Sequence, residues 1–350
     1  MVIWAYAAIL AWSLATPAVP AAATPVASPM PRPEQVMAVP PELRAQLQKQ
    51  VIDEGGSERS RLERLTAFLF QKSGLGMQYS ADATLTVEQA YRTRKGNCLT
   101  FTLLTVALAR ASGLDAYGQE LDDIVAWRVD DKLIYGFNHV NAGISIGNLR
   151  FTVDVARDLV MARNAPEPVS DQRLLALYYS NRATELLAGV SPAMATPYMD
   201  LALQLAPRYA GAWANAGVMR LRQGDRQAAE RDYLRALALD PKNASALLNL
   251  VALYRLNGDE AHRAIYARRI EKIRAKDPYF HLLQAEDAEK RGDYAGAVQH
   301  YRSAIRLYDG DPRFYLGLAR VYRQLGEARR ARRAMDRAAA LSRTIAANRN

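Results

Sequence analysis

The spacing of apolar and polar residues changes once along the chain and divides it into two parts. Between residues 42 and 163, stretches with a helical period are followed by stretches with the alternating period of β-strands. From residue 174 to residue 345 the period is helical throughout. This order predicts an α+β domain followed by an all-α domain.

Apolar spacing and end signals locate the first helices of the α+β domain. Leu43–Ile52 and Ser57–Gln71 both show helical spacing, and Ser57 is a suitable N-cap. Thr86 and Gln89 form a capping-box pattern, which predicts that a short helix begins there.

The segment Cys98–Ser112 contains no glycine, proline or acidic residue and is apolar on nearly every side. A helix of this composition is expected to be buried, and Gly113 is expected to end it. Residues 95–97 form a turn directly before the segment, so the turn would place Cys98 in the first helical turn.

Strand-like stretches follow at Ile124–Val129, Leu133–Val140 and Leu149–Val155. Residues 147–148 are Gly-Asn, which is typical of a two-residue hairpin turn between the last two stretches. In such a hairpin His139 lies opposite Ala156. Asn141 then lies opposite Asp154. Because side chains alternate along strands, these four residues share one face, with His139 and Asp154 as diagonal neighbours.

The second part of the chain carries an internal repeat of 34 residues. Turns of Gly followed by Asp or Glu recur at residues 224, 258, 292 and 326. Each unit combines large residues with small residues where helices cross, and the best-defined unit has Trp213, Gly217, Ala229, Tyr233, Ala236 and Pro241. This pattern resembles the tetratricopeptide repeat, which stacks helix pairs into a solenoid. The resemblance predicts about five repeats over residues 174–345.

The first 41 residues fit neither part. Residues 1–23 carry no charge, and the apolar run Val2–Leu14 is too short to cross a bilayer comfortably. Small residues follow, so residues 1–23 are interpreted as a secretory signal peptide, with an uncleaved membrane anchor as the alternative. Residues 24–41 are rich in proline and alanine and predict an extended linker, with ordered structure beginning near Glu42. We therefore expect an exported, periplasmic or envelope-associated protein.

The net positive charge of the chain is confined to its second half. Residues 1–175 hold 17 Lys and Arg against 18 Asp and Glu, whereas residues 176–350 hold 29 against 18. A basic helical surface can be merely solvated, or it can contact an acidic protein or an anionic envelope surface. The sequence has no nucleic-acid motif, and no nucleic-acid partner is expected.

Cys98, His139 and Asp154 are the candidate catalytic residues. Cys98 is the only cysteine in the chain, and His139 is the only histidine before the repeats. A helix N-terminus and a nearby imidazolium both favour a thiolate, and a carboxylate can orient the imidazole. The thiolate would attack an amide carbonyl, with the backbone N–H of Cys98 as one oxyanion donor. Gln78 and Asn97 are near in sequence, but neither is assigned as the second donor.

Each of these residues also has a structural interpretation. Cys98 can be a small apolar residue at the start of a buried helix. His139 can be a strand histidine satisfied by a carbonyl, and Asp154 can simply end a strand. Their joint placement favours the catalytic interpretation.

The residues around Cys98 resemble the core motif of the transglutaminase-like superfamily. Residues 94–101 (RKGNCLTF) have the Gly-x-Cys turn that opens the central helix, and residues 108–114 (LARASGL) have the Arg-x-x-Gly step that ends it. His139 and Asp154 fall where that family carries its His and Asp. The resemblance covers about residues 60–160 and implies a papain-like fold in residues 42–163. Members of the family include proteases, transamidases and inactive relatives.

The sequence thus predicts an α+β papain/transglutaminase-like domain followed by an all-α tetratricopeptide solenoid. The predicted function is an exported cysteine-dependent amidase or acyltransferase that acts on a peptide or protein substrate, with the repeats binding the substrate or a protein partner. The alternative is a non-catalytic, peptide-binding scaffold. No metal spacing or phosphate loop is present, so no cofactor is expected.

Overall fold

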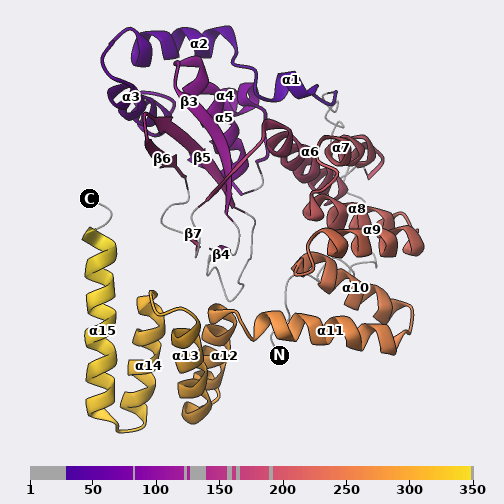
Figure 1. The fold of residues 1–350 in the computed structure, drawn as a ribbon, viewed down its shortest axis with the longest axis vertical. Coiled ribbons are helices and arrows are strands. Elements are labelled where there is room, and N and C mark those ends of the chain that lie inside the picture. The colour runs from indigo at the N-terminus through magenta and orange to yellow at the C-terminus, as the bar shows by residue number, and fades with distance from the viewer. Residues whose placement is uncertain are drawn as a thin grey trace, which may run out of the picture. The chain divides into compact units, whose positions relative to one another are not determined.

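The computed structural model describes residues 29–81, 83–121, 124–126, 139–155, 160–162, 166–188 and 192–347. The chain forms two compact units, residues 1–249 and residues 250–350 (Figure 1). The predicted signal peptide, residues 1–23, lies outside the described residues.

Short helices lead into the first unit. They are α1 (Pro33–Val36), α2 (Pro41–Leu47) with a π-helical continuation η1 (Gln48–Ile52), α3 (Glu58–Phe70) and α4 (Val87–Thr93). The Ser57 hydroxyl accepts a hydrogen bond from the Ser60 N–H and caps α3, as predicted. Thr86 and Gln89 form the predicted capping box at the start of α4. These ends are set by local side-chain hydrogen bonds, which is why the sequence locates them.

The prediction that ordered structure begins near Glu42 is wrong. Val36 of α1 is fully buried in the core of the first unit. The Tyr179 hydroxyl donates a 2.7 Å hydrogen bond to the carbonyl of Pro31. Prolines occupy the first turns of α1 and α2, where a missing N–H has no cost and the fixed φ suits a helix. Proline in this segment therefore starts helices instead of keeping the chain extended.

The central helix and the main sheet form the core of the α+β domain. Helix α5 (Cys98–Ala111) ends before Gly113, whose φ of 76° lies in the left-handed region. The sheet is antiparallel, with strand order β6-β5-β3-β8. Its strands are β3 (Asp115–Leu121), β5 (His139–Ile146), β6 (Leu149–Val153) and β8 (Glu167–Val169). Strand β3, an inner strand of the sheet, was not predicted.

Two small two-stranded sheets complete this domain. Strands β1 (Gln78–Tyr79) and β2 (Lys95–Gly96) pair in parallel just before α5. Strands β4 (Ile124–Ala126) and β7 (Val160–Ala162) pair in antiparallel orientation. Strand β4 matches the start of the predicted strand at residues 124–129, and residues 127–138 lie outside the described part of the chain.

The hairpin of β5 and β6 has the predicted register. Ile146 pairs with Leu149 across the two-residue turn, and Ala142 pairs with Val153. Gly147 has a φ of 56°, which the first position of such a turn requires. The register places Asn141 and Asp154 at the open end of the hairpin, next to His139.

The first helix pairs of the array belong to the same compact unit as the α+β domain. They are α6 (Asp171–Ala188), α7 (Pro192–Leu205), α8 (Ala210–Arg222) and α9 (Arg226–Leu239). A Cβ on Gly118 of β3 would lie 2.6 Å from the side chain of Leu174, so glycine lets α6 pack on the sheet. Arg173 of α6 forms an ion pair with Glu120 of β3 at 2.7 Å.

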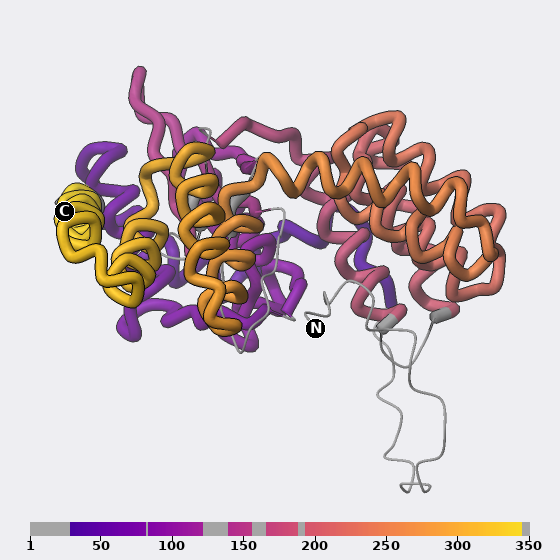
Figure 2. The backbone as a smooth tube through the Cα atoms, turned by 90° about the horizontal axis from the view of Figure 1, so that it is seen from below, coloured from indigo at the N-terminus to yellow at the C-terminus, as the bar shows by residue number. Residues whose placement is uncertain are grey.

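Helix pairs continue to the end of the described chain. Helix α10 (Ala244–Leu256) contains the boundary between the two units. The second unit then holds α11 (Glu260–Arg274), α12 (Pro278–Lys290), α13 (Tyr294–Leu307), α14 (Pro312–Gln324) and α15 (Ala328–Ala347). Figure 2 shows consecutive helices doubling back as hairpins. The glycines at the four predicted turns all have positive φ: Gly224, Gly258, Gly292 and Gly326.

Candidate functional site

Cys98 is the first residue of α5, and its position is fixed by the side chain before it. Asn97 is the N-cap, and its side-chain oxygen accepts the N–H of Thr100 at 3.0 Å. Its side-chain nitrogen donates to the Thr84 hydroxyl at 2.7 Å. Because the oxygen and the nitrogen of this buried side-chain amide both form hydrogen bonds within the turn, we do not assign Asn97 as the second oxyanion donor. Gln78 is exposed on β1.

A second set of contacts holds the chain before Cys98 against the helix. The Thr100 hydroxyl donates to the Ala83 carbonyl at 2.7 Å and accepts the Leu85 N–H at 2.8 Å. A Cβ on Gly96 would lie 2.6 Å from the Thr100 side chain, so glycine is required for this close approach. The turn thus places Cys98 at the first helical position, where backbone N–H groups have no partner within the helix. Cys98 is half-buried and its thiol is free.

His139 and Asp154 form a buried pair. The His139 Nε2 atom lies 2.7 Å from the Asp154 Oδ2 atom, and their side chains are 5% and 9% exposed. The Asn141 side-chain amide donates to the same Asp154 oxygen at 3.1 Å. The Cys98 side chain lies near His139 and interacts with it electrostatically. Nε2 is the ring nitrogen that faces Asp154.

The surroundings of His139 favour its charged form. Burial by itself lowers the pKa of His139, but the hydrogen bond to Asp154 and the interaction with Cys98 outweigh it and raise the pKa from 6.5 to about 9. An imidazolium near a thiol favours the thiolate. A charged imidazole near the thiol is the feature on which the catalytic interpretation of Cys98, His139 and Asp154 depends.

The structure brings together the three residues singled out in the sequence and adds one more. Asn141 was placed opposite Asp154 from the hairpin register, but its hydrogen bond to the carboxylate was not predicted. The sequence signal for this hydrogen bond is that Asn141 lies two residues after His139, which puts both side chains on one face of β5. Asn141 thereby holds Asp154 from a second direction.

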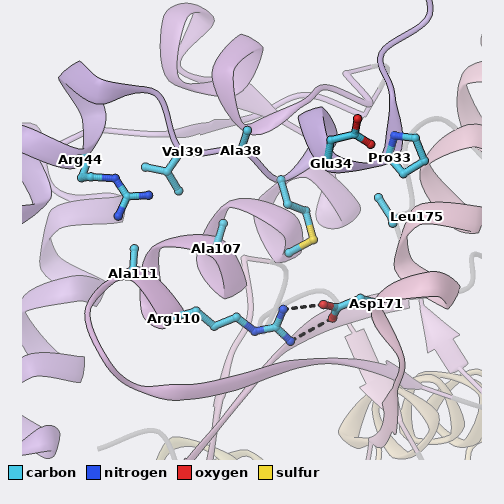
Figure 3. Close-up of a pocket in the computed structure, with 11 residues that line it drawn as sticks. Pro33, Glu34, Ala38, Val39, Arg44, Ala107, Arg110, Ala111, Asp171 and Leu175 are labelled. Atoms are coloured by element: carbon cyan, nitrogen blue, oxygen red, sulfur yellow. Dashed lines mark hydrogen bonds and ion pairs between the residues drawn. The ribbon is translucent and has the colours of Figure 1, made fainter.

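A separate hollow of about 610 Å³ lies at the other end of α5. Figure 3 shows Arg110 of α5 and Asp171 of α6, two of its lining residues, pointing toward each other. The two side chains form a bidentate ion pair, in which the two terminal guanidinium nitrogens of Arg110 lie 2.6 and 2.9 Å from the two carboxylate oxygens of Asp171. The apolar lining comes from both sides and includes Met37, Val39, Ala107, Ala111 and Leu175. Since Cys98 is at the opposite end of this helix, the hollow is separate from the candidate site.

In the described part of the chain, no helix is long and apolar enough to span a membrane. This finding does not extend to residues 1–28, which include the predicted signal peptide.

Family models match both parts of the chain. The transglutaminase-like superfamily model matches residues 45–117, a range that contains Cys98 and ends before His139. Two tetratricopeptide repeat models match residues 210–243 and 288–346.

A curated relative is the cellulose synthase operon protein C of Xanthomonas axonopodis pv. citri (strain 306). It is 34% identical over 152 residues, which are 41% of this chain and 10% of the relative. The match thus spans about a tenth of the length of the relative.

Among solved structures, similar chains include pilF of Pseudomonas aeruginosa, with 19% identity and a TM-score of 0.29, covering 49% of this chain and 78% of that one. MamA of Desulfovibrio magneticus RS-1 (residue 41 to the end) has 15% identity and a TM-score of 0.27. The match covers 50% of this chain and 97% of the MamA chain. From its sequence-family matches and its own helix and strand order, the chain combines a transglutaminase-like α+β domain with a following array of tetratricopeptide repeats.

Proposed function

We propose that the protein is a cysteine-dependent amidase or acyltransferase that acts on a peptide or protein substrate. The observation that carries this proposal is the position of Cys98 at the start of α5, near a His139 ring whose Nε2 atom lies 2.7 Å from the Asp154 carboxylate. A buried structural cysteine needs no imidazole beside it, and a buried histidine needs no carboxylate.

The chemistry follows from the arrangement of the three side chains. The Cys98 thiolate attacks the carbonyl carbon of an amide and forms a tetrahedral intermediate. The backbone N–H of Cys98 is positioned to donate to the developing oxyanion. The His139 imidazolium gives its proton to the leaving amine, and a thioester remains on Cys98. Water or a second amine then gives a proton to His139 as it attacks the thioester carbonyl. The C–S bond breaks, the acyl group leaves as a carboxylic acid or a new amide, and the Cys98 thiolate is regenerated beside a charged His139.

Asp154 and Asn141 support the histidine in this scheme. The Asp154 carboxylate holds the ring in one orientation and stabilises its positive charge. Asn141 fixes the carboxylate by donating to the oxygen that His139 also contacts. Neither residue needs to touch the substrate.

The repeats are proposed to bind the substrate or a protein partner. Tetratricopeptide arrays build extended surfaces from stacked helix pairs, and such surfaces suit peptide recognition. Export to the periplasm or envelope is proposed from the uncharged apolar run at residues 1–23. In the array, the arginines of α15 are proposed to contact an acidic or envelope surface.

The proposal is tested by labelling with iodoacetamide, comparing the wild type with His139→Ala and Cys98→Ser. We expect rapid labelling of the wild type at pH 7, slow labelling of His139→Ala and none of Cys98→Ser. Equal labelling of wild type and His139→Ala would contradict the catalytic proposal. It would favour the alternative, a peptide-binding scaffold without catalysis, in which Cys98 is a structural residue.

A further inference from the structure

The hollow at the C-terminal end of α5 takes no part in the proposed reaction. Its volume of about 610 Å³ falls in the range of ~300–1,000 Å³ that is usual for small-molecule sites. It is lined by residues 33–44, by the last turns of α5 and by the start of α6, all in the first unit (Figure 3). Val36 is fully buried, and the carbonyl of Pro31 accepts the Tyr179 hydroxyl. The walls of the hollow are therefore ordered parts of the fold.

Most of the lining is apolar. Four of its apolar residues also pack against the core of the first unit: Met37, Val39, Ala111 and Leu175. Ala107 and Ala111 lie about one turn apart on α5, and their small side chains leave space that a larger side chain would fill. An apolar hollow of this kind can remove a hydrocarbon chain from water.

The charged residues of the lining are paired, with one exception. Arg110 donates from Nε to a backbone carbonyl of β3 and from both terminal nitrogens to Asp171. Glu34 lies 3.3 Å from Arg32. For Arg44 no ion pair is found within the described part of the chain, and Figure 3 shows its guanidinium directed toward the other lining residues. The hollow thus combines an apolar lining with one unpaired positive charge.

This combination selects the chemistry of a ligand. A carboxylate near Arg44 would form a charge-assisted hydrogen bond, and a hydrocarbon chain would cover the apolar lining. A peptide would also bring N–H and C=O groups, but the other charged side chains of the lining are already in ion pairs. We propose that the hollow binds an aliphatic carboxylate of medium chain length, with its carboxylate at Arg44 and its chain against α5 and α6. The site lies at the opposite end of α5 from Cys98 and does not depend on the proposed reaction.

The test is a calorimetric titration of the full-length protein with decanoate, below its critical micelle concentration. We expect one decanoate ion bound per chain and a rise in melting temperature, because a ligand of the folded state stabilises that state. Butyrate has the same carboxylate but a short chain, and it should bind at least about tenfold more weakly, since each buried methylene is worth about fourfold in affinity. Decyltrimethylammonium has the same chain length and the opposite charge, and it should also bind more weakly.

Two variants remove the charge and the space separately. Arg44→Gln should weaken decanoate binding about fivefold, and it should leave the fold unchanged because this side chain is exposed. Ala107→Leu combined with Ala111→Leu should fill the hollow and abolish binding. Leucine is a good helix former, so α5 should remain helical.

Matched controls make the result specific. Lys49→Gln removes an exposed cation that does not line the hollow, and Ala244→Leu with Ala261→Leu enlarges two exposed alanines of the array. Both control variants should bind decanoate like the wild type. The proposal is overturned if the wild type binds no decanoate, if decyltrimethylammonium binds as tightly as decanoate, or if the Arg44 and leucine variants keep their helical circular dichroism and their affinity. Equal weakening in the controls would mean that decanoate adheres to the protein without a site, which would also overturn it.

Discussion

The transglutaminase-like domain and the helical array use their polar side chains in opposite ways. In the domain, His139 and Asn141 both contact the same buried oxygen of Asp154, at 2.7 and 3.1 Å. In the array, acidic residues recur in one local role, because Asp225, Asp259 and Asp293 each cap a helix by accepting the N–H three residues later. A feature that occurs once has to be judged by geometry, whereas a repeated feature can be judged by its spacing.

The difference also explains why unusual residues in the two regions are recognised by different arguments. The Cys98 site is supported by the contacts that surround it, because no second copy exists for comparison. In the array, the contact of His281 with His300 is noticed because the other repeats carry different residues at the same positions. In a repeat array, each residue can be compared with the residues at the equivalent positions of the other repeats.

The largest effect on activity is expected from Asp154→Asn. An amide at this position can still hydrogen-bond to His139 but cannot stabilise the imidazolium or hold the same tautomer. Once a substrate is known, we expect turnover to fall by a factor on the order of 10²–10⁴, with little change in the fold. Turnover can be followed by release of amine from a peptide substrate. Before a substrate is known, the rate of Cys98 labelling serves as the measurement, and an unchanged rate would make Asp154 a structural residue.

A second prediction concerns the dependence of stability on pH. The pKa of His139 is raised to about 9 in the folded protein, from 6.5 in an ordinary site. A raised pKa stabilises the fold fully below pH 6.5, and this stabilisation is lost as the pH rises to about 9. The shift corresponds to roughly 3 kcal/mol.

The measurement for this prediction is urea unfolding of the wild type and Asp154→Asn at several pH values between 6 and 9.5. The advantage of the wild type over the variant should shrink as the pH rises through this window. A difference that stays constant would mean that His139 is neutral in the folded protein, which would remove the imidazolium from the proposed mechanism.

The helix ends and the hairpin register could be predicted from the sequence because they depend on neighbouring residues. The side-chain oxygens of Ser57 and Thr86 cap helices by accepting the backbone N–H of the residue three positions later. The Gly-Asn turn sets the pairing of β5 with β6, and hence the meeting of His139 with Asp154. Contacts within a few residues leave a pattern in the sequence that can be recognised.

What the sequence did not predict depends on residues far apart in the chain. Strand β3 pairs with β5 through residues that are 18 to 30 positions apart, and with β8 beyond it. Val36 is buried by a core that includes the first array helix, so the proline-rich segment before α2 is ordered by tertiary packing. Asn141 could be placed opposite Asp154, but whether its amide reaches the carboxylate depends on the side-chain geometry of the folded hairpin.

Two glycines of the second unit provide a third prediction, which compares packing with turn geometry. A Cβ on Gly317 would lie 2.2 Å from the ring of Tyr301, whose hydroxyl is held by Glu289. Gly317→Ala should therefore cost about 3 kcal/mol, near the upper end for overpacking. A Cβ on Gly258 would meet nothing within 4 Å, so Gly258→Ala should cost only about 1 kcal/mol for its positive φ.

Amide hydrogen exchange of the second unit measures both effects. Gly317→Ala should speed exchange throughout α13 and α14, and Gly258→Ala should speed it mainly at the turn between α10 and α11. If Gly258→Ala were the more damaging, the turn would control the stability of the repeats and helix crossing would be secondary.

The smallest effect is expected at α15, the end of the described array. This helix carries six arginines and one acidic residue over 328–347. Arg330 pairs with Glu327, and Arg337 lies 3.6 Å from Asp309. For Arg329, Arg332, Arg333 and Arg343 no ion pair is found within the described part of the chain, and all four are exposed. A solvated face needs charge but not a single sign of charge, so this cluster favours an anionic partner surface.

Vesicle binding of the full-length protein tests this cluster. We expect binding to anionic vesicles at low salt that weakens strongly by 0.1–0.2 M salt, because exposed charges are screened over about 10 Å at 0.1 M. Replacing Arg329, Arg332 and Arg333 with Gln should weaken binding further. The matched control also removes three arginines, Arg263→Gln, Arg274→Gln and Arg291→Gln, all of which already have acidic partners. If both sets of variants bind equally, general positive charge explains the binding. If the wild type does not bind anionic vesicles even at low salt, α15 has no affinity for an anionic membrane, and its arginines serve only to keep the last helix soluble.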